Sequence, residues 1–323
     1  MPNTAENLIP AVHEVRQGIW AVPIRMPEQL PYSLCYLIED GEGSLHVVDP
    51  GWDSDENWRA LTEDLAALGR TAGDVASIVV THLHRDHVAA AGRLAEASGA
   101  PVLMHRVEAA ALERQGSELE RIPPSRFVDW GVPGDRRTEL AEAAARHRDS
   151  DVRGPDRVLD DGDELAIPGR SITVLWTPGH TSGHICLREE REKLLFTGDH
   201  VLPSIFSGIG LGGRSDTNPI ADYLGSLERV AIFDDHEALP GHEAPFTGLS
   251  HRAGTVAEHH LTRSRQVRRV LDGAAEPTIW DVASQLTWTA GWENLSGFML
   301  LSALAQTELH VDFVRSETAL RYL

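Results

Sequence analysis

Four side chains that can bind a metal ion lie within one short stretch of the chain: His82, His84, Asp86 and His87. They follow an apolar, β-branched run at 78–80 that is typical of a buried strand. The cluster therefore belongs to the loop at the C-terminal end of a strand, where open α/β proteins carry their chemistry. In an extended backbone His82 and His84 can point the same way. Imidazole and carboxylate groups are ligands that zinc prefers, so the cluster predicts a zinc site.

Further histidines and carboxylates follow strand-like or apolar runs elsewhere in the chain. They are Asp49, His180, Asp199 and His242. Side chains at such positions can converge on one edge of a sheet sandwich. The alternative, a turn at 82–87 that is rich in histidine by chance, leaves this repeated pattern unexplained. Taken alone, Asp49 is an ordinary turn residue, and His105 more naturally caps a short strand than binds metal.

The elements that must position these residues are short strands interspersed with helices. We expect strands at 18–24, 34–39, 44–48, 76–81, 101–105, 156–159, 164–167, 171–176, 185–188 and 193–197. Helical periodicity is found at 57–68, 89–97 and 221–233. The alternation predicts an α/β fold.

The segment 106–150 is the most helical and charged part of the chain. Amphipathic helices at 106–121 and 138–148 flank a segment with Pro123 and Pro124, which cannot be a helix interior. We interpret the whole as a helical insertion beside the mouth of the site, with Phe127 and Trp130 as apolar substrate contacts. The alternative is a solvated helical pair in which Trp130 is the core anchor.

The character of the chain changes from about residue 250. An arginine-rich helix at 251–271 is followed by a short helix that Thr278 caps and by a third helix at 296–313. We therefore predict a catalytic domain of residues 1–250 and a small helical module of residues 251–323. The module has more apolar residues than it needs for itself, so we expect it to pack on the main domain or to form a homodimer. The residues concerned are Trp288, Trp292, Phe298, Leu300 and Leu301.

Composition narrows the choice of partners. With 29 Lys and Arg against 49 Asp and Glu, the net charge of −20 disfavours nonspecific binding of nucleic acid. Cys35 and Cys186 have no metal-binding spacing and predict no disulfide framework. The N-terminus lacks a secretion signal, and no apolar run approaches the roughly 18 residues of a membrane helix. We expect a cytoplasmic protein with no membrane partner.

Five motifs, taken in order, resemble the metallo-β-lactamase fold superfamily. They are Val-Val-Asp49-Pro-Gly, Thr-His82-Leu-His84-Arg-Asp86-His87, Thr-Pro-Gly-His180-Thr, Thr-Gly-Asp199-His and Leu-Pro-Gly-His242-Glu. The resemblance implies an αββα sandwich with a metal site on its edge. The C-terminal module looks like the winged-helix-like appendage of the group that contains glyoxalase II-like hydrolases and one type of endoribonuclease.

The resemblance also implies a role for each motif residue. His82, His84 and His180 would hold one zinc ion, and Asp86, His87 and His242 a second. Asp199 would bridge the two ions, and Asp49 would support the ligand loop. We expect His184 and His200, which adjoin the ligands, to support them or to pack against them. No ligand position is missing, so the resemblance implies two zinc ions per chain.

A pair of zinc ions that share a solvent molecule would supply a metal-bound hydroxide at neutral pH. We therefore predict a zinc-dependent hydrolase in which Asp86 or Asp199 carries the proton to the leaving group. The leading substrate is a thioester or ester of a small or medium-sized acyl compound. A phosphodiesterase or endoribonuclease, a lactonase, a β-lactam hydrolase and a partner-binding protein with a structural metal remain alternatives.

Two segments bear on the substrate. The Gly-rich loop 207–213 follows Asp199 closely and should reach the rim of the site. Its apolar surface suits an uncharged acyl chain, since only Arg214 is near to meet a phosphate. Arginines of the 251–271 helix could meet an anionic carrier such as a coenzyme A phosphate, or could form a solvated helix face. These are Arg263, Arg265, Arg268 and Arg269.

Overall fold

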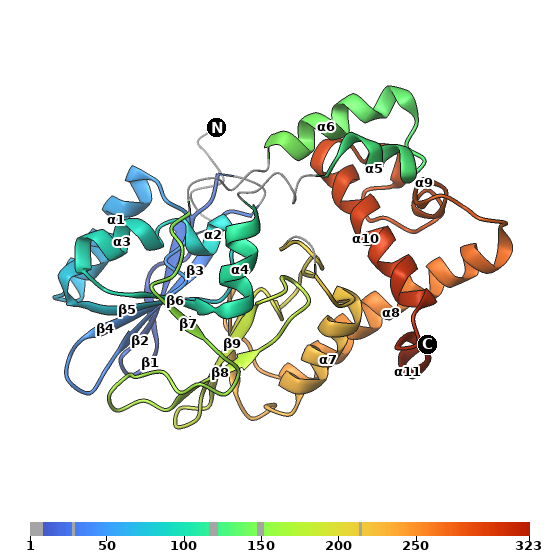
Figure 1. Ribbon diagram of the computed structural model, residues 1–323. Helices are drawn as coiled ribbons and strands as arrows, with labels where there is room; N and C mark the ends of the chain where they lie inside the picture. Colours follow the sequence, from blue (N-terminus) through green and yellow to red (C-terminus); the bar gives the residue numbers. More distant parts are fainter. Residues whose placement is uncertain (1–8, 28–29, 116–121, 147–151, 213–214) are drawn as a thin grey trace, which may run out of the picture.

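Two β-sheets packed face to face form the centre of the molecule in a computed structural model, which describes residues 9–27, 30–115, 122–146, 152–212 and 215–323. The larger sheet has the order β1 (His13–Arg16), β2 (Ile19–Arg25), β3 (Tyr32–Glu39), β4 (Leu45–Val48), β5 (Val75–Val80), β6 (Val102–His105) and β7 (Arg157–Leu159). The smaller sheet has the order β11 (Glu237–Pro240), β10 (Leu194–Gly198), β9 (Ile185–Glu189) and β8 (Ile172–Trp176). Figure 1 shows both sheets with helices around them.

Each sheet changes from antiparallel to parallel pairing along its width. In the larger sheet β1 to β4 are antiparallel, and β4 to β7 are parallel. In the smaller sheet β8, β9 and β10 are antiparallel, whereas β10 and β11 are parallel. Parallel strands need both faces covered, which explains why all four residues of β4 and the last three of β5 are buried. The C-terminal ends of β5, β10 and β11 are the ends from which the metal-binding motifs continue.

Helices cover the outer faces of both sheets. Beside the larger sheet lie α1 (Asp55–Ala67), α2 (Arg85–Val88), α3 (Ala91–Ser98) and α4 (Arg106–Gln115), with η2 (Ala72–Asp74) before β5. Beside the smaller sheet lie α7 (Pro219–Ala231) and α8 (Leu249–Gly273). Ser54 caps α1, and Asn218 caps α7 ahead of Pro219, so both helices begin where side chains satisfy their free amides. The predicted αββα sandwich is confirmed.

The strand alternation divides the core into separate layers. In β2, Ile19 and Ala21 pack between the two sheets, while Val22 and Ile24 pack under the outer helices. A strand predicted at 164–167 is reduced to a single bridge from Glu164 to Thr173. The segment is too short to continue the pairing, because a turn precedes it and Pro168 ends it.

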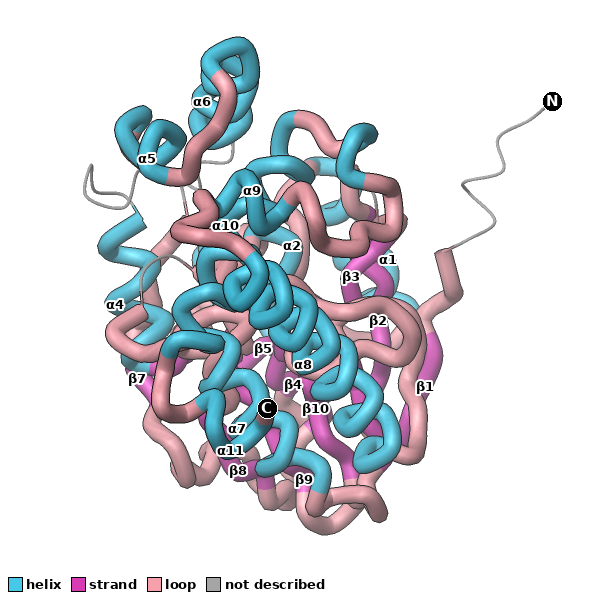
Figure 2. Tube along the Cα trace, turned by 90° about the vertical axis from the view of Figure 1, so that its right-hand side faces the viewer, coloured by secondary structure: helices cyan, strands magenta, loops and turns pink. Residues whose placement is uncertain are grey.

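The C-terminal region is helical, as predicted, and residues 251–323 contain no strand that could serve as the wing of a winged helix. Its elements after α8 are α9 (Ile279–Ala283), η5 (Trp292–Asn294), α10 (Gly297–Arg315) and α11 (Ala319–Tyr322). Figure 2 shows α8 and α10 on one side of the molecule, in front of the smaller sheet. Phe313 and Ala319 join the core between α7, α8 and that sheet. The end of the chain is therefore packed onto the sandwich.

The insertion packs on this helical region. Its elements are α4, α5 (Pro124–Asp129), η4 (Gly134–Arg136) and α6 (Arg137–Arg146), and residues 116–121 and 147–151 lie outside the described chain. Phe127 and Trp130 share a buried cluster with Leu300, Leu301 and Leu304 of α10. These leucines are thus covered within the chain itself. Among the described residues, no helix is both long and apolar enough to cross a membrane.

Candidate metal centre

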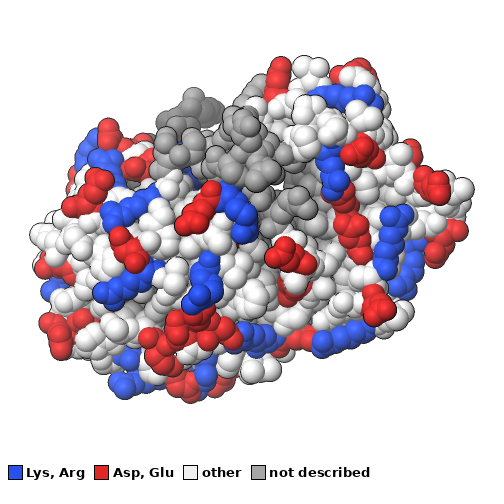
Figure 3. All heavy atoms as spheres, in the orientation of Figure 1, with Lys and Arg blue, Asp and Glu red and all other residues white. Residues whose placement is uncertain are grey.

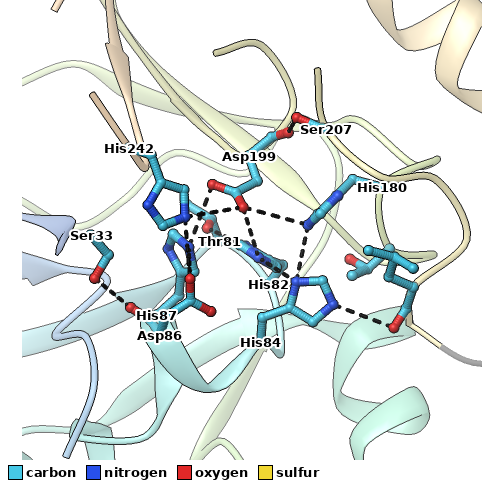
Figure 4. Close-up of polar contacts among 12 residues, drawn as sticks. Ser33, Thr81, His82, His84, Asp86, His87, His180, Asp199, Ser207 and His242 are labelled. Atoms are coloured by element: carbon cyan, nitrogen blue, oxygen red, sulfur yellow. Dashed lines mark hydrogen bonds and ion pairs between the residues drawn. The ribbon is translucent and has the colours of Figure 1, made fainter. Parts of the chain in front are cut away.

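The seven predicted ligands come together at one end of the two sheets (Figure 4). Four loops of separate origin supply them. His82 to His87 follow β5, His180 follows β8, and Asp199 and His242 follow β10 and β11. Because these strands end at the same edge of the sandwich, residues far apart in sequence become neighbours.

Four side chains form the first group of donors. His84 Nδ1 lies 3.1 Å from His82 Nε2 and 3.0 Å from His180 Nε2. Asp199 Oδ2 lies 4.0 Å from His82 Nε2 and 3.7 Å from His180 Nε2. Three imidazole nitrogens and one carboxylate oxygen therefore surround a common point.

A second group of donors lies on the other side of Asp199. Asp86 Oδ2 is 3.5 Å from His87 Nε2 and 3.2 Å from His242 Nε2. Asp199 Oδ1 is 3.4 Å from His87 Nε2, and Asp199 Oδ2 is 3.4 Å from His242 Nε2. The carboxylate of Asp199 thus faces both groups, which is the position of a bridging ligand.

The donor atoms fit metal ions both in their spacing and in the hydrogen-bond partners that two of them lack. Zinc bonds of about 2.0–2.1 Å in tetrahedral geometry place donors roughly 3.3 Å apart, within the range of the distances above. His87 Nε2 and Asp199 Oδ1 are buried and have no hydrogen-bond partner in the described chain. Buried polar atoms without partners cost free energy, and a cation between them would satisfy both.

Each ligand histidine is held by its other ring nitrogen. In all five, that nitrogen lies within hydrogen-bond distance of an oxygen, which fixes the tautomer and leaves the remaining lone pair for a metal. The partners are Thr81 Oγ1 for His82 (3.0 Å), the Leu211 carbonyl for His84 (3.3 Å), Asp49 Oδ2 for His87 (3.0 Å), the Gly208 carbonyl for His180 (2.7 Å) and the Tyr32 carbonyl for His242 (3.0 Å). The rings are therefore oriented before any metal binds.

Asp49 connects the ends of β4 and β5. Its carboxylate accepts hydrogen bonds from the amide and the hydroxyl of Thr81, both at 2.7 Å, as well as from His87. Its backbone has a φ of 52°, which a non-glycine residue adopts only when its contacts repay the strain. The family resemblance implied that Asp49 supports the ligand loop, and its hydrogen bonds to Thr81 and His87 are of the kind that such a role requires.

His184 and His200 lie beside the ligands without joining them. His184 Nε2 accepts a hydrogen bond from the amide of Asp199 at 3.2 Å, and His184 Nδ1 donates to Thr177 Oγ1 at 2.9 Å. His200 is buried, and its ring packs edge-on against Tyr223 with a centroid distance of 4.9 Å. His184 thus fixes the backbone of Asp199, while His200 fills space behind it.

Glu108 is a supporting residue that sequence reasoning missed. This carboxylate, at the start of α4, is fully buried and accepts hydrogen bonds from the amides of Leu83 and Gly183 at 2.8 and 2.7 Å. It also accepts one from the hydroxyl of Thr181 at 2.6 Å. Burial raises its pKa, which its three donors partly offset. Glu108 therefore ties the loop of His82 and His84 to the loop of His180.

Two glycines let the loops approach this closely. A Cβ on Gly241 would lie 2.4 Å from Asp199 Oδ1 and 2.6 Å from His87 Cε1. A Cβ on Gly183 would lie 2.1 Å from the backbone nitrogen of Glu108. At both positions any side chain would push a ligand loop away from the centre.

The carboxylates make the second group a favourable place for positive charge. Burial opposes the charge of His242, but Asp199 and Asp86 outweigh it and raise the pKa of His242 to about 10. For the same reason the pKa values of Asp86 and Asp199 lie below their ordinary value despite burial. In the first group, burial and the neighbouring His84 lower the pKa of His180 to about 4, so its imidazole is neutral and suited to metal binding.

Three other residues considered from sequence lie elsewhere. Phe127 and Trp130 are 1% and 3% exposed in the core shared with α10, which matches the interpretation of Trp130 as a core anchor. His105 stacks on Trp176 with ring centroids 5.4 Å apart, and it belongs to none of the donor groups of the described chain.

Comparison with known proteins agrees with this geometry. The family model described as "Metallo-beta-lactamase superfamily" matches residues 30–242. The probable metallo-hydrolase YqjP of Bacillus subtilis (strain 168) is 28% identical, over 94% of each chain. The acyl-coenzyme A thioesterase MBLAC2 of Homo sapiens is 33% identical over 278 residues, covering 76% of this chain and 90% of the relative. Among solved structures, the metallo-beta-lactamase family protein TTHA1429 from Thermus thermophilus has a TM-score of 0.77 at 30% identity, covering 95% and 96% of the two chains.

Proposed function

This chain belongs to the metallo-beta-lactamase superfamily and is a metal-dependent hydrolase, and we propose that it hydrolyses thioesters of coenzyme A or of a similar acyl carrier. The observation that carries the proposal is its similarity, over most of its length, to a relative named as an acyl-coenzyme A thioesterase. The donor set supports it, because it has the ligand types of a hydrolytic metal site and a bridging carboxylate between them.

We further propose zinc as the metal, with two ions per chain. His82, His84 and His180 would hold one ion, Asp86, His87 and His242 the other, and Asp199 both. When bound, such ions polarise a carbonyl oxygen and lower the pKa of water to near neutrality. The protein's part is to keep the five imidazoles in one tautomer and the two carboxylates ionised.

The burial of the ligands indicates the side from which substrate would arrive. His84 and Asp86 are partly exposed, whereas the other five ligands are buried. The carboxylate of Asp86 is therefore placed to accept the proton of the attacking water at the oxygen that does not face His87 and His242, and to pass it to the departing thiolate. Ser33 Oγ donates to the backbone carbonyl of Asp86 at 2.7 Å and holds this residue at the opening.

The loop after β10 forms one rim of the centre. The Gly208 and Leu211 carbonyls contact His180 and His84, and the hydroxyl of Ser207 donates to the carbonyl of Asp199. Between 203 and 212 the loop has no charged side chain, and Gly213 and Arg214 lie outside the described residues. An uncharged rim favours an acyl chain over a phosphate backbone, which would call for clustered Lys or Arg side chains there.

The test is hydrolysis of a panel of substrates by metal-loaded protein. We expect thiol release from acyl-coenzyme A, followed with a thiol reagent; Cys35 and Cys186 are fully buried and contribute little background. Chelation should abolish the release, and zinc should restore it. Asp199→Asn is the matched control, because it keeps the side-chain shape but removes the bridging charge. Efficient cleavage of RNA, of a lactone or of a β-lactam with all thioesters inert would overturn the proposal.

A further inference from the structure

One face of α8 carries a row of basic side chains. Arg252, His259 and Arg263 are separated by seven and four residues, so they lie on the same side of the helix. Over eleven residues this row extends roughly 16 Å along the helix axis. Figure 2 shows that α8 runs across the molecule beside α10.

This row begins at the rim of the metal centre. The ring of Phe206 stacks on His259 with centroids 3.9 Å apart and planes 7° apart, and the guanidinium of Arg252 lies 4.8 Å from the same ring. Arg252 also donates hydrogen bonds to the carbonyls of Leu202 and Ile205. Phe206 is 41% exposed and lies two residues before Gly208, whose carbonyl holds His180. The rim is therefore continuous with this face of α8.

Among the residues that the structure describes, Arg263, at the far end of the row, has no anionic partner. Its guanidinium packs over the ring of Trp288 at 4.2 Å and donates one hydrogen bond to the Thr287 carbonyl at 3.3 Å. Its Nη1 is buried without a hydrogen-bond partner, and in the described chain it forms no ion pair with a carboxylate. Burial lowers the pKa of Arg263. A partly buried cation with one unpartnered nitrogen is a favourable place for an anion.

The neighbours of Arg263 supply no negative charge. His260 is buried with both ring nitrogens unpartnered, and His310 Nδ1 is bonded only to the hydroxyl of Ser264. Arg265 of the same helix differs, since it is paired with Glu258 on the exposed side. On the face in Figure 3 acidic and basic side chains are interspersed, and the whole chain has a net charge of −20. Among the described residues, Arg263 is the one arginine with a buried side-chain nitrogen that has no hydrogen-bond partner, which points to an anionic ligand.

We propose that Arg263, Trp288 and His259 form a subsite for the phosphate-bearing end of a coenzyme A-type carrier whose thioester lies at the metal centre. This inference rests on the proposed function and assigns the far end of its substrate. Arginine recognises phosphate through two parallel hydrogen bonds, and the indole and imidazole rings offer flat surfaces for an adenine. The pantetheine arm separates the thioester from the phosphates, and Arg263 lies about one helical turn beyond His259, on which the rim residue Phe206 stacks. Arg252 does not belong to the phosphate subsite, because its guanidinium is bonded to the carbonyls of Leu202 and Ile205 at the rim.

The experiment compares hexanoyl-coenzyme A with hexanoyl-pantetheine, which has the same thioester but no phosphates. For Arg263→Gln we expect KM for the coenzyme A ester to rise about ten- to a hundredfold, with kcat little changed. The pantetheine ester should be hydrolysed equally by both proteins. Arg265→Gln is the matched control, because it removes an arginine of the same helix that faces solvent. Arg263→Lys, which keeps the charge but loses the planar fork, should give an intermediate KM and guards against a folding defect.

Calorimetric titration with coenzyme A itself tests the subsite without turnover. Binding that is weakened in Arg263→Gln and unchanged in Arg265→Gln supports the subsite, even if no thioester is hydrolysed and the proposed function fails. Equal KM values for the two esters in the unmodified protein, or equal effects of both arginine variants, would overturn the subsite while leaving the hydrolase intact. Binding of a single-stranded RNA oligonucleotide at Arg263, with no binding of coenzyme A, would also overturn it.

Discussion

Two buried groups of histidines in this molecule have different chemical characters. In the metal centre, each of five rings has one nitrogen held by an oxygen and the other directed at a shared point. Between α8 and α10, His260 and His310 are stacked with centroids 6.2 Å apart, and three of their four nitrogens have no partner. Both groups contain buried histidines, so burial alone does not make a metal site. Convergence and a fixed tautomer do.

The difference follows from the elements that carry the two groups. Loops at strand ends bring several backbones to one edge of the sheets, and each can aim a side chain at the same point. Two packed helices present side chains along a seam instead, where rings meet face to face. Variants of the metal centre should therefore change metal content and turnover, whereas variants of the group between α8 and α10 should change stability only slightly.

The largest effect is expected from Asp199→Asn. Its Oδ2 faces both donor groups and its Oδ1 faces the second, so the loss of its charge weakens both at once. Turnover should fall to the level of the metal-free protein, and metal content should fall with it. Elemental analysis and a thioester assay on the same preparation measure both. Full activity in this variant would mean that Asp199 does not bridge.

Glu108→Ala should have the next largest effect, although Glu108 touches no metal. Its loss removes three hydrogen bonds that tie the loops of His84 and His180 together. Losing such support typically costs about 10- to 100-fold in metal affinity or activity. Metal titration should show the loss in the group of His82, His84 and His180, with the group of His242 retained. Equal weakening of both groups would indicate a general folding defect.

Phe127→Ala should act on stability rather than on chemistry. Its ring is buried against α10, and truncation of a buried aromatic residue costs about 3–5 kcal/mol. Thermal unfolding should shift to lower temperature, while KM and kcat of the remaining folded protein stay unchanged. A raised KM at unchanged stability would instead support the substrate-contact interpretation.

His260→Phe should have the smallest effect and sharpens the contrast between the two histidine groups. The ring shape is kept, and two buried nitrogens without partners are removed. Replacement of such groups by apolar ones is nearly neutral or stabilising, within about 1 kcal/mol. Metal content and turnover should be unchanged. A loss of metal in this variant would connect the helical group to the centre.

The sequence was informative where a motif and its position in the fold coincide. A run such as 78–80 followed by His82 places ligands at the end of a strand, and the resemblance carried by five motifs implied the αββα sandwich. Glu108 could not be found in this way, because a glutamate in an amphipathic helix predicts solvent exposure. The core shared by Phe127 and Leu300 was also out of reach, since it depends on packing between segments far apart in sequence.

The central claim is that seven side chains form two adjoining metal sites with one shared ligand. Elemental analysis of purified protein, with His84→Ala and His242→Ala alongside, tests it most directly. We expect about two zinc ions per unmodified chain and about one in each variant, because each variant removes a ligand of only one site. A single ion per chain at full activity, or variants that both retain two ions, would contradict it.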